Sequence, residues 1–136
     1  MEAKRIELCV PAERSTLLII RMTTAGVMSR AGLTLDEMDD MKMGVDEACN
    51  LLLLQKPGCQ SLSVCYEYDE NSVSVLVEGE GAGEATDEKR DMNMQEVIRC
   101  ILESIADEVS LTSREDGGMK AIRLKKNIMN CRRSAV

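Results

Sequence analysis

The chain has 136 residues, 44% apolar and 30% charged, which predicts one globular domain, 1–136, built on a single core. Lys and Arg number 17 against 24 Asp and Glu, a net charge of −7. This acidic balance argues against nucleic-acid binding, because contacts to phosphates need clustered cations. No long apolar run is present, so we expect no membrane segment and a cytoplasmic protein. The six cysteines form no C-x-x-C pair and His is absent, so we expect no metal site and mostly buried free thiols.

The first half of the chain predicts a strand followed by two helices. Alternation over Arg5–Val10 predicts the strand, which Pro11 ends by removing an amide donor. Helical spacing then runs from Glu13 to about Ala31, with Gly32 as terminator. A second helix, from about Leu35 to Lys56, opens with a Thr34–Glu37 capping box and ends at Pro57–Gly58. Its core stripe has three- and four-residue steps and comprises Met38, Met41, Val45, Ala48 and Leu52.

The second half predicts a hairpin, a loop, a third helix and two more strands. Ser61–Tyr68 and Ser72–Val77 read as antiparallel strands joined by a polar turn. Gly79–Asn93 shows neither helical nor strand period and is expected to be a mobile loop. The remaining expected segments are a helix over Met94–Glu108, strands over Val109–Thr112 and Met119–Lys126, and a frayed tail over 127–136. This order predicts an α+β fold, with helices on one face of a mixed, mostly antiparallel sheet.

Four segments of the chain are distinctive: IELCVPAERSTLLIIR from Ile6, GVMSRAGLTLDEMDDMKMGVDEAC from Gly26, ILESIADEVSL from Ile101 and GGMKAIRLKK from Gly117. They resemble one branch of the GHKL (Bergerat) ATPases, the bacterial anti-sigma factor serine kinases of the RsbW type. The resemblance implies a two-layer GHKL-like sandwich, binding of ATP and magnesium, a homodimer, and a sigma factor or anti-sigma antagonist as partner. It places the partner surface on the first helices, roughly Glu13–Asp40.

The second helix carries the family's E-x-x-x-N motif in altered form. The resemblance makes Glu47 the catalytic base, while the family's magnesium-binding Asn, four residues on, is replaced by Leu51. Leucine cannot hold a hard cation, which requires oxygen ligands. Asn50 is one residue early, about 100° around the helix. It could bind magnesium only if the helix shifted register or unwound there.

The other two nucleotide elements are altered as well. The family's D-x-G-x-G motif aligns with Gly79, Gly81 and Gly83, so the glycines remain but the adenine-reading Asp is absent. A flexible turn after a strand explains these glycines at least as well as adenine binding. The glycine-rich lid is replaced by a segment, Asp91–Arg99, without glycine. We therefore expect no bound nucleotide, with ATP and magnesium as cofactors only if the site is retained.

Apolar residues stand where the resemblance places nucleotide. Met43, Leu51 and Leu54 share a helix side with Glu47, opposite the core stripe, so the helix end is predicted to be buried on both sides. A pocket closed by packing, a protein interface and a small apolar ligand are the alternatives. The leading hypothesis is an anti-sigma-like binding protein without ATP turnover. The alternatives are an active serine-protein kinase, with Glu47 as base and Asn50 on magnesium, and a dimeric scaffold subunit.

Overall fold

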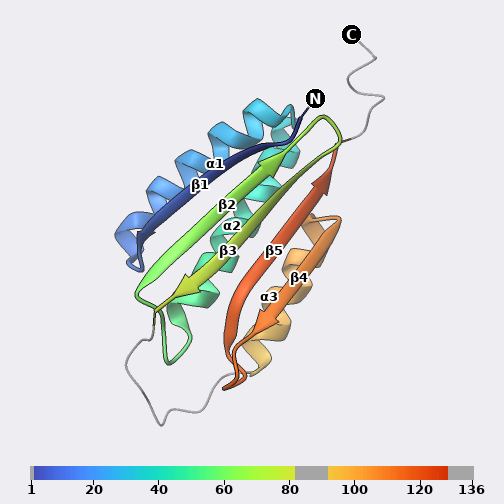
Figure 1. Ribbon diagram of the computed structural model, residues 1–136. Coiled ribbons are helices and arrows are strands. Elements are labelled where there is room, and N and C mark those ends of the chain that lie inside the picture. The colour runs from blue at the N-terminus through green and yellow to red at the C-terminus, as the bar shows by residue number, and fades with distance from the viewer. Residues whose placement is uncertain (1, 82–91, 129–136) are drawn as a thin grey trace.

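The computed structural model describes residues 2–81 and 92–128. Five strands and three α-helices follow one another in an α+β order (Figure 1). Their bounds, in chain order, are β1 Lys4–Pro11, the short 3-10 helix η1 Arg14–Thr16, α1 Leu17–Ala31, α2 Leu35–Leu54, β2 Ser61–Tyr68, β3 Ser72–Glu80, α3 Met92–Ile105, β4 Glu108–Ser113 and β5 Met119–Asn127.

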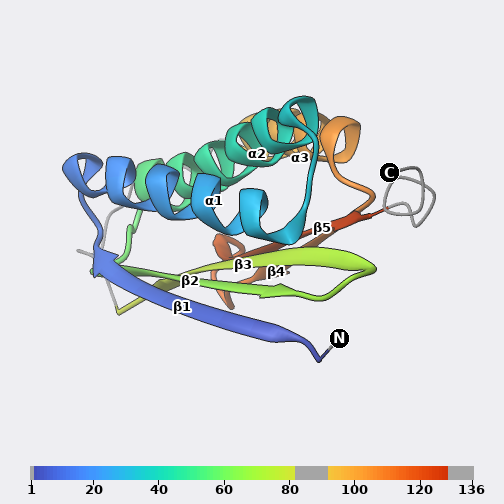
Figure 2. The same ribbon diagram turned by 90° about the horizontal axis from the view of Figure 1, so that it is seen from above.

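The strands form one sheet in the order β1-β2-β3-β5-β4, with β1 and β4 at its edges. All four pairings are antiparallel, so the sheet is antiparallel throughout rather than mixed. The three helices cover one face of the sheet (Figure 2). This two-layer arrangement confirms the predicted GHKL-like fold class.

Alternation along the central strands places their apolar side chains under the helices. Val64, Tyr66, Val75 and Leu124 are fully buried in one core with the predicted stripe of α2. In that stripe Met41, Val45, Ala48 and Leu52 are buried, and Met38 is half-buried against the same core. Burial of this kind is the main stabilising contribution to such a fold. The predicted capping box at the start of α2 is confirmed, because the hydroxyl of Thr34 accepts a hydrogen bond from the amide of Glu37.

Several predicted boundaries were wrong, and long-range pairing explains each shift. The loop predicted from Gly79 begins later, because Gly79 pairs with Leu62 and extends β3 to Glu80. The tail predicted to fray from Asn127 is ordered at its start: Asn127 ends β5, and the amide of the buried Ile128 donates to the Asn71 carbonyl. Residues 82–91 of the expected loop, and 129–136 of the tail, lie outside the described residues.

The ends of the helices also differ from the predicted ones. The first turn after β1 is the 3-10 helix η1, so α1 begins at Leu17 rather than Glu13. Helix α2 ends at Leu54, short of Lys56, and α3 runs from Met92 to Ile105, since Glu108 already pairs with Lys125 in β4.

Mostly buried thiols were expected, and this prediction was wrong for the described cysteines. Cys49 is buried, whereas Cys59 and Cys65 are half-buried and Cys9 and Cys100 are exposed. Cys9 and Cys65 lie on the face of the sheet opposite the helices. Successive side chains of a strand point to opposite faces, so their position in the strand, rather than their residue type, decides their exposure. No helix in the described part of the chain combines the length and hydropathy needed to cross a bilayer.

Candidate functional site

The candidate site lies along the second half of α2, where Glu47 is held on a regular helix. Helix α2 is continuous to Leu54, so Asn50 stays about 100° around the helix from position 51. Both Glu47 and Asn50 are half-buried. Neither the shift of register nor the unwinding that would bring Asn50 to the family's metal position is present.

Leu51 occupies the position four residues after Glu47, and its side chain belongs to the core. It is 5% exposed and lies in the same buried cluster as Leu52 and Val77. A leucine side chain offers no oxygen ligand to magnesium. Residues 47 and 51 therefore do not make the carboxylate and amide pair that the family motif supplies.

Burial on both sides of the helix end was predicted and is only partly present. Leu51 and Leu52 are buried, and Leu53 packs against the core. Leu54 is 59% exposed and Met43 is also exposed, so the prediction was wrong for these two. Helix α3 covers the flank of α2 that carries Gly44, where an added side chain would meet Ile105 and Leu102.

Gly79, at the position of the family's adenine-reading Asp, is crowded by a cysteine. A Cβ atom at this position would lie 3.1 Å from both Cβ and Sγ of Cys59, and 3.8 Å from Leu52. A carboxylate side chain could enter only if Cys59 moved. Burial raises the pKa of the Cys59 thiol, against the opposing effect of Arg114, so this side chain is a neutral packing group at pH 7.

Gly81 is required by the backbone itself. Its φ of +80° is in the left-handed region, which favours glycine, and a Cβ atom there would meet the Gln60 side-chain oxygen at 2.8 Å. The turn after β3 thus accounts for this glycine without an adenine ring. Gly83 and the first residue of the lid replacement, Asp91, lie outside the described residues.

Two polar contacts that were not predicted from the sequence fix the loop after α2. The side-chain amide of Gln55 donates to the Met119 carbonyl at 2.6 Å, and its oxygen accepts from the Met119 amide at 2.8 Å. Arg114 donates to the carbonyl of Pro57 at 2.8 Å. The end of α2 is thereby held to β5 and to the turn between β4 and β5. No local sequence signal could have paired these residues, since they are 64 and 57 positions apart.

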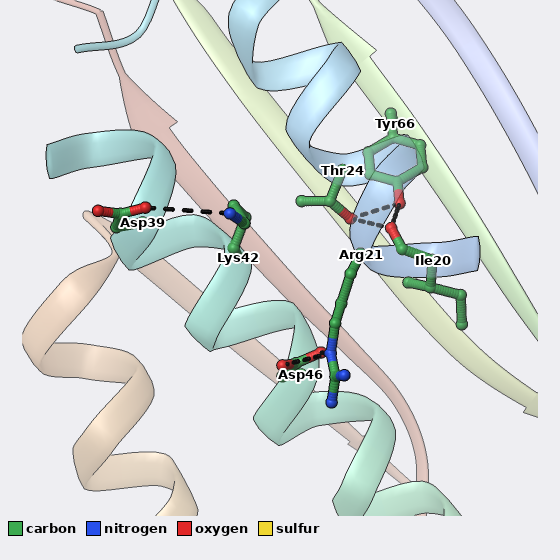
Figure 3. Close-up of polar contacts among 7 residues, drawn as sticks. All are labelled: Ile20, Arg21, Thr24, Asp39, Lys42, Asp46 and Tyr66. Atoms are coloured by element: carbon green, nitrogen blue, oxygen red, sulfur yellow. Dashed lines mark hydrogen bonds and ion pairs between the residues drawn. The ribbon is translucent and has the colours of Figure 1, made fainter. Parts of the chain in front are cut away.

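A second polar cluster joins α1 to α2 and to the sheet (Figure 3). The Nε atom of Arg21 lies 2.9 Å from both carboxylate oxygens of Asp46. Nearby, the hydroxyls of Thr24 and Tyr66 are 2.7 Å apart, and Thr24 donates to the Ile20 carbonyl. Burial raises the pKa of Tyr66 to about 12. These contacts set the position of α1 against the helix that carries Glu47.

Comparison with known proteins supports the resemblance seen in the sequence. No family model matches the chain. Serine-protein kinases RsbW of Bacillus thuringiensis (strain Al Hakam), Bacillus cereus (strain AH820) and Bacillus mycoides (strain KBAB4) are each 31% identical to it over 80 residues. The match covers 57% of this chain and 50% of each relative, so the chain spans about half the length of the relatives it matches. The resemblance to the RsbW-like anti-sigma factor family is confirmed over that stretch.

Proposed function

We propose that the chain is an anti-sigma-factor-like regulatory protein that binds a sigma factor or an anti-sigma antagonist without turning over ATP. The observation that carries the proposal is Leu51, a buried core residue at the family's magnesium position. The continuous helix at Asn50 and the crowding of Gly79 by Cys59 support it further. Like the family it resembles, the protein is proposed to act as a homodimer.

Calorimetry with ATP and magnesium tests the loss of the nucleotide site. We expect no binding tighter than about 100 µM, equivalent to roughly −5.5 kcal/mol. Tighter binding would overturn the proposal and favour the active kinase, with Glu47 as base. In that case, a Glu47→Gln variant that no longer phosphorylates the antagonist would identify Glu47 as the base.

The surface proposed for the partner is the outer face of α1. Leu18 and Met22 are four residues apart, so they share one helix face, and both are exposed. Exposed aliphatic side chains grouped in this way are a feature of protein interfaces. Arg21 and Glu37, which also lie within the partner surface expected over Glu13–Asp40, are held by Asp46 and by the capping box, so both have partners within the chain.

Pull-down of candidate sigma factors and antagonists from the native host tests this surface. Leu18→Asp/Met22→Asp should abolish capture, whereas Val97→Asp, which changes an exposed apolar residue of α3, should not. Circular dichroism of each variant checks that it folds. Capture that survives the double change on α1 would show that the partner binds elsewhere, and capture of neither class of protein by the unmodified chain would contradict the proposed function.

A further inference from the structure

The face of the sheet opposite the helices, which we call the open face, is hollowed near the turn between β2 and β3. This face is toward the viewer in Figure 1, where the turn lies beside the end of β5. The hollow has a volume of about 120 Å³. Its charged and hydroxyl side chains are Glu67, Asp69, Ser72, Ser74, Arg123 and Lys125. The helices cover the other face (Figure 2), so the hollow is separate from the candidate site on α2.

The charges of the hollow are separated across three strands. Glu67 of β2, Ser74 of β3 and Lys125 of β5 occupy one row of paired positions. The preceding residue of each strand is fully buried beneath the helices, so these three side chains point to the open face. Neighbouring strands are about 4.8 Å apart, which places the acidic and basic ends of the row roughly 10 Å apart at the backbone. Asp69 follows on the acidic side and Arg123 precedes on the basic side, with serine between the two walls.

Pairing within the chain leaves the charges on both walls available. Arg123 is exposed, and over residues 2–81 and 92–128 it makes no ion pair with another side chain. Lys125 approaches Glu108 only to 3.7 Å. On the opposite wall, Glu67 approaches Arg5 only to 3.7 Å. These long contacts between partly exposed groups contribute little, so a ligand can replace them.

Asp69 is a fixed carboxylate at the rim of the hollow. Its Oδ1 atom accepts hydrogen bonds from the amides of Asn71 at 2.7 Å and Ser72 at 3.0 Å. These bonds hold the pKa of the Asp69 carboxyl below its usual value, so the group is ionised at neutral pH. The turn thus orients one negative charge toward the hollow before any ligand binds.

The two walls together select for a ligand that carries both signs of charge. An anion would be repelled by the carboxylates and a cation by the guanidinium and ammonium groups, whereas a zwitterion meets an opposite charge on each wall. Water occupies about 30 Å³ in the liquid, so the hollow accommodates roughly four groups of that size. This matches the carboxylate, central carbon and ammonium of an α-amino acid.

We propose that the hollow binds the zwitterionic head group of a free α-amino acid. The ligand carboxylate lies on Arg123 and Lys125, and its ammonium group lies on Glu67 and Asp69. The amino-acid side chain extends to solvent, because the hollow has room only for the head group. The site goes beyond the proposed function and does not depend on it, since the proposed partner surface is on α1.

Titration of the ¹⁵N-labelled full chain with L-alanine, followed by amide chemical shifts, tests the proposal. We expect saturable shifts at residues 67–74 and 123–125. The dissociation constant should be on the order of 1 mM, since so small a ligand has few atoms to contribute. Acetate and methylammonium each carry one of the two charges of L-alanine. Each should bind about tenfold more weakly or worse, because the contacts to one wall are lost.

Glu67→Gln and Arg123→Gln remove one charge from each wall and should each weaken L-alanine binding by about tenfold. The matched controls are Glu78→Gln on β3 and Lys120→Gln on β5, which lie outside the hollow and should leave the affinity unchanged. Unchanged amide shifts elsewhere check that each variant folds. The proposal fails if no saturable shifts occur up to about 20 mM, if acetate binds as tightly as L-alanine, or if the controls weaken binding as much as the variants of the hollow. None of these results would affect the proposed function.

Discussion

Replacing Leu51 by asparagine restores the family's E-x-x-x-N pattern and tests whether position 51 belongs to the core or to a metal site. Leu51 is 5% exposed, and losing the burial of such a side chain costs about 2–3 kcal/mol. A buried amide without partners adds roughly 1–3 kcal/mol. We therefore expect the free energy of unfolding to fall by about 3–6 kcal/mol, a large part of the ~5–15 kcal/mol typical of a domain.

Urea unfolding followed by circular dichroism measures this change, since the chain has no tryptophan. The matched control is Leu54→Asn, the same substitution one turn along at a residue that is 59% exposed, where we expect a loss below about 1 kcal/mol. Equal, small losses in the two variants would refute the core assignment of Leu51. Recovery of Leu51→Asn stability on adding magnesium and ATP would show that position 51 reaches a phosphate site.

Three further predictions concern the contacts that hold α1 and α2 in place. Thr34→Ala removes the hydroxyl that caps Glu37 and should lower the free energy of unfolding by about 1 kcal/mol. Gln55→Ala leaves the amide and carbonyl of Met119 unpaired and should cost about 1–3 kcal/mol; both losses are read from urea midpoints. Burial raises the pKa of Tyr66 from 10.0 to about 12, so the unfolded chain loses this phenolic proton at a lower pH than the folded chain does. Between pH 10 and 12, wild-type stability should thus fall by about 2–3 kcal/mol more than that of Tyr66→Phe, as measured by unfolding under reducing conditions.

Local patterns were sufficient to predict the elements that local chemistry determines. The capping box at Thr34, the turn between β2 and β3, and the buried stripe of α2 all follow from residues within a few positions of one another. The extension of β3 to Glu80 does not, because it depends on Gly79 meeting Leu62 across the sheet. Partners that meet only in the fold decide such boundaries, whereas periodicity decides the centre of an element.

In the candidate site, too, the local sequence predicts some features and only the fold decides the others. The absence of an oxygen ligand at Leu51 was evident from the sequence, and so was its burial. The exposure of Leu54 was not, because it depends on which parts of the fold cover the end of α2. The crowding of Gly79 by Cys59 was equally hidden, since nothing in either local segment indicates that the loop after α2 folds back against β3.

The segment Asp46-Glu47-Ala48-Cys49, which carries much of the resemblance to the kinases, is explained largely by packing in this chain. Asp46 binds Arg21 and so couples α2 to α1. Ala48 and Cys49 are fully buried, and burial raises the pKa of Cys49 to about 12, which keeps its thiol neutral. Three of the four residues therefore have structural roles that a chain without ATP chemistry would still need. A match to this segment is evidence for the family's architecture. Evidence for the family's chemistry would be an oxygen ligand at position 51, where this chain has leucine.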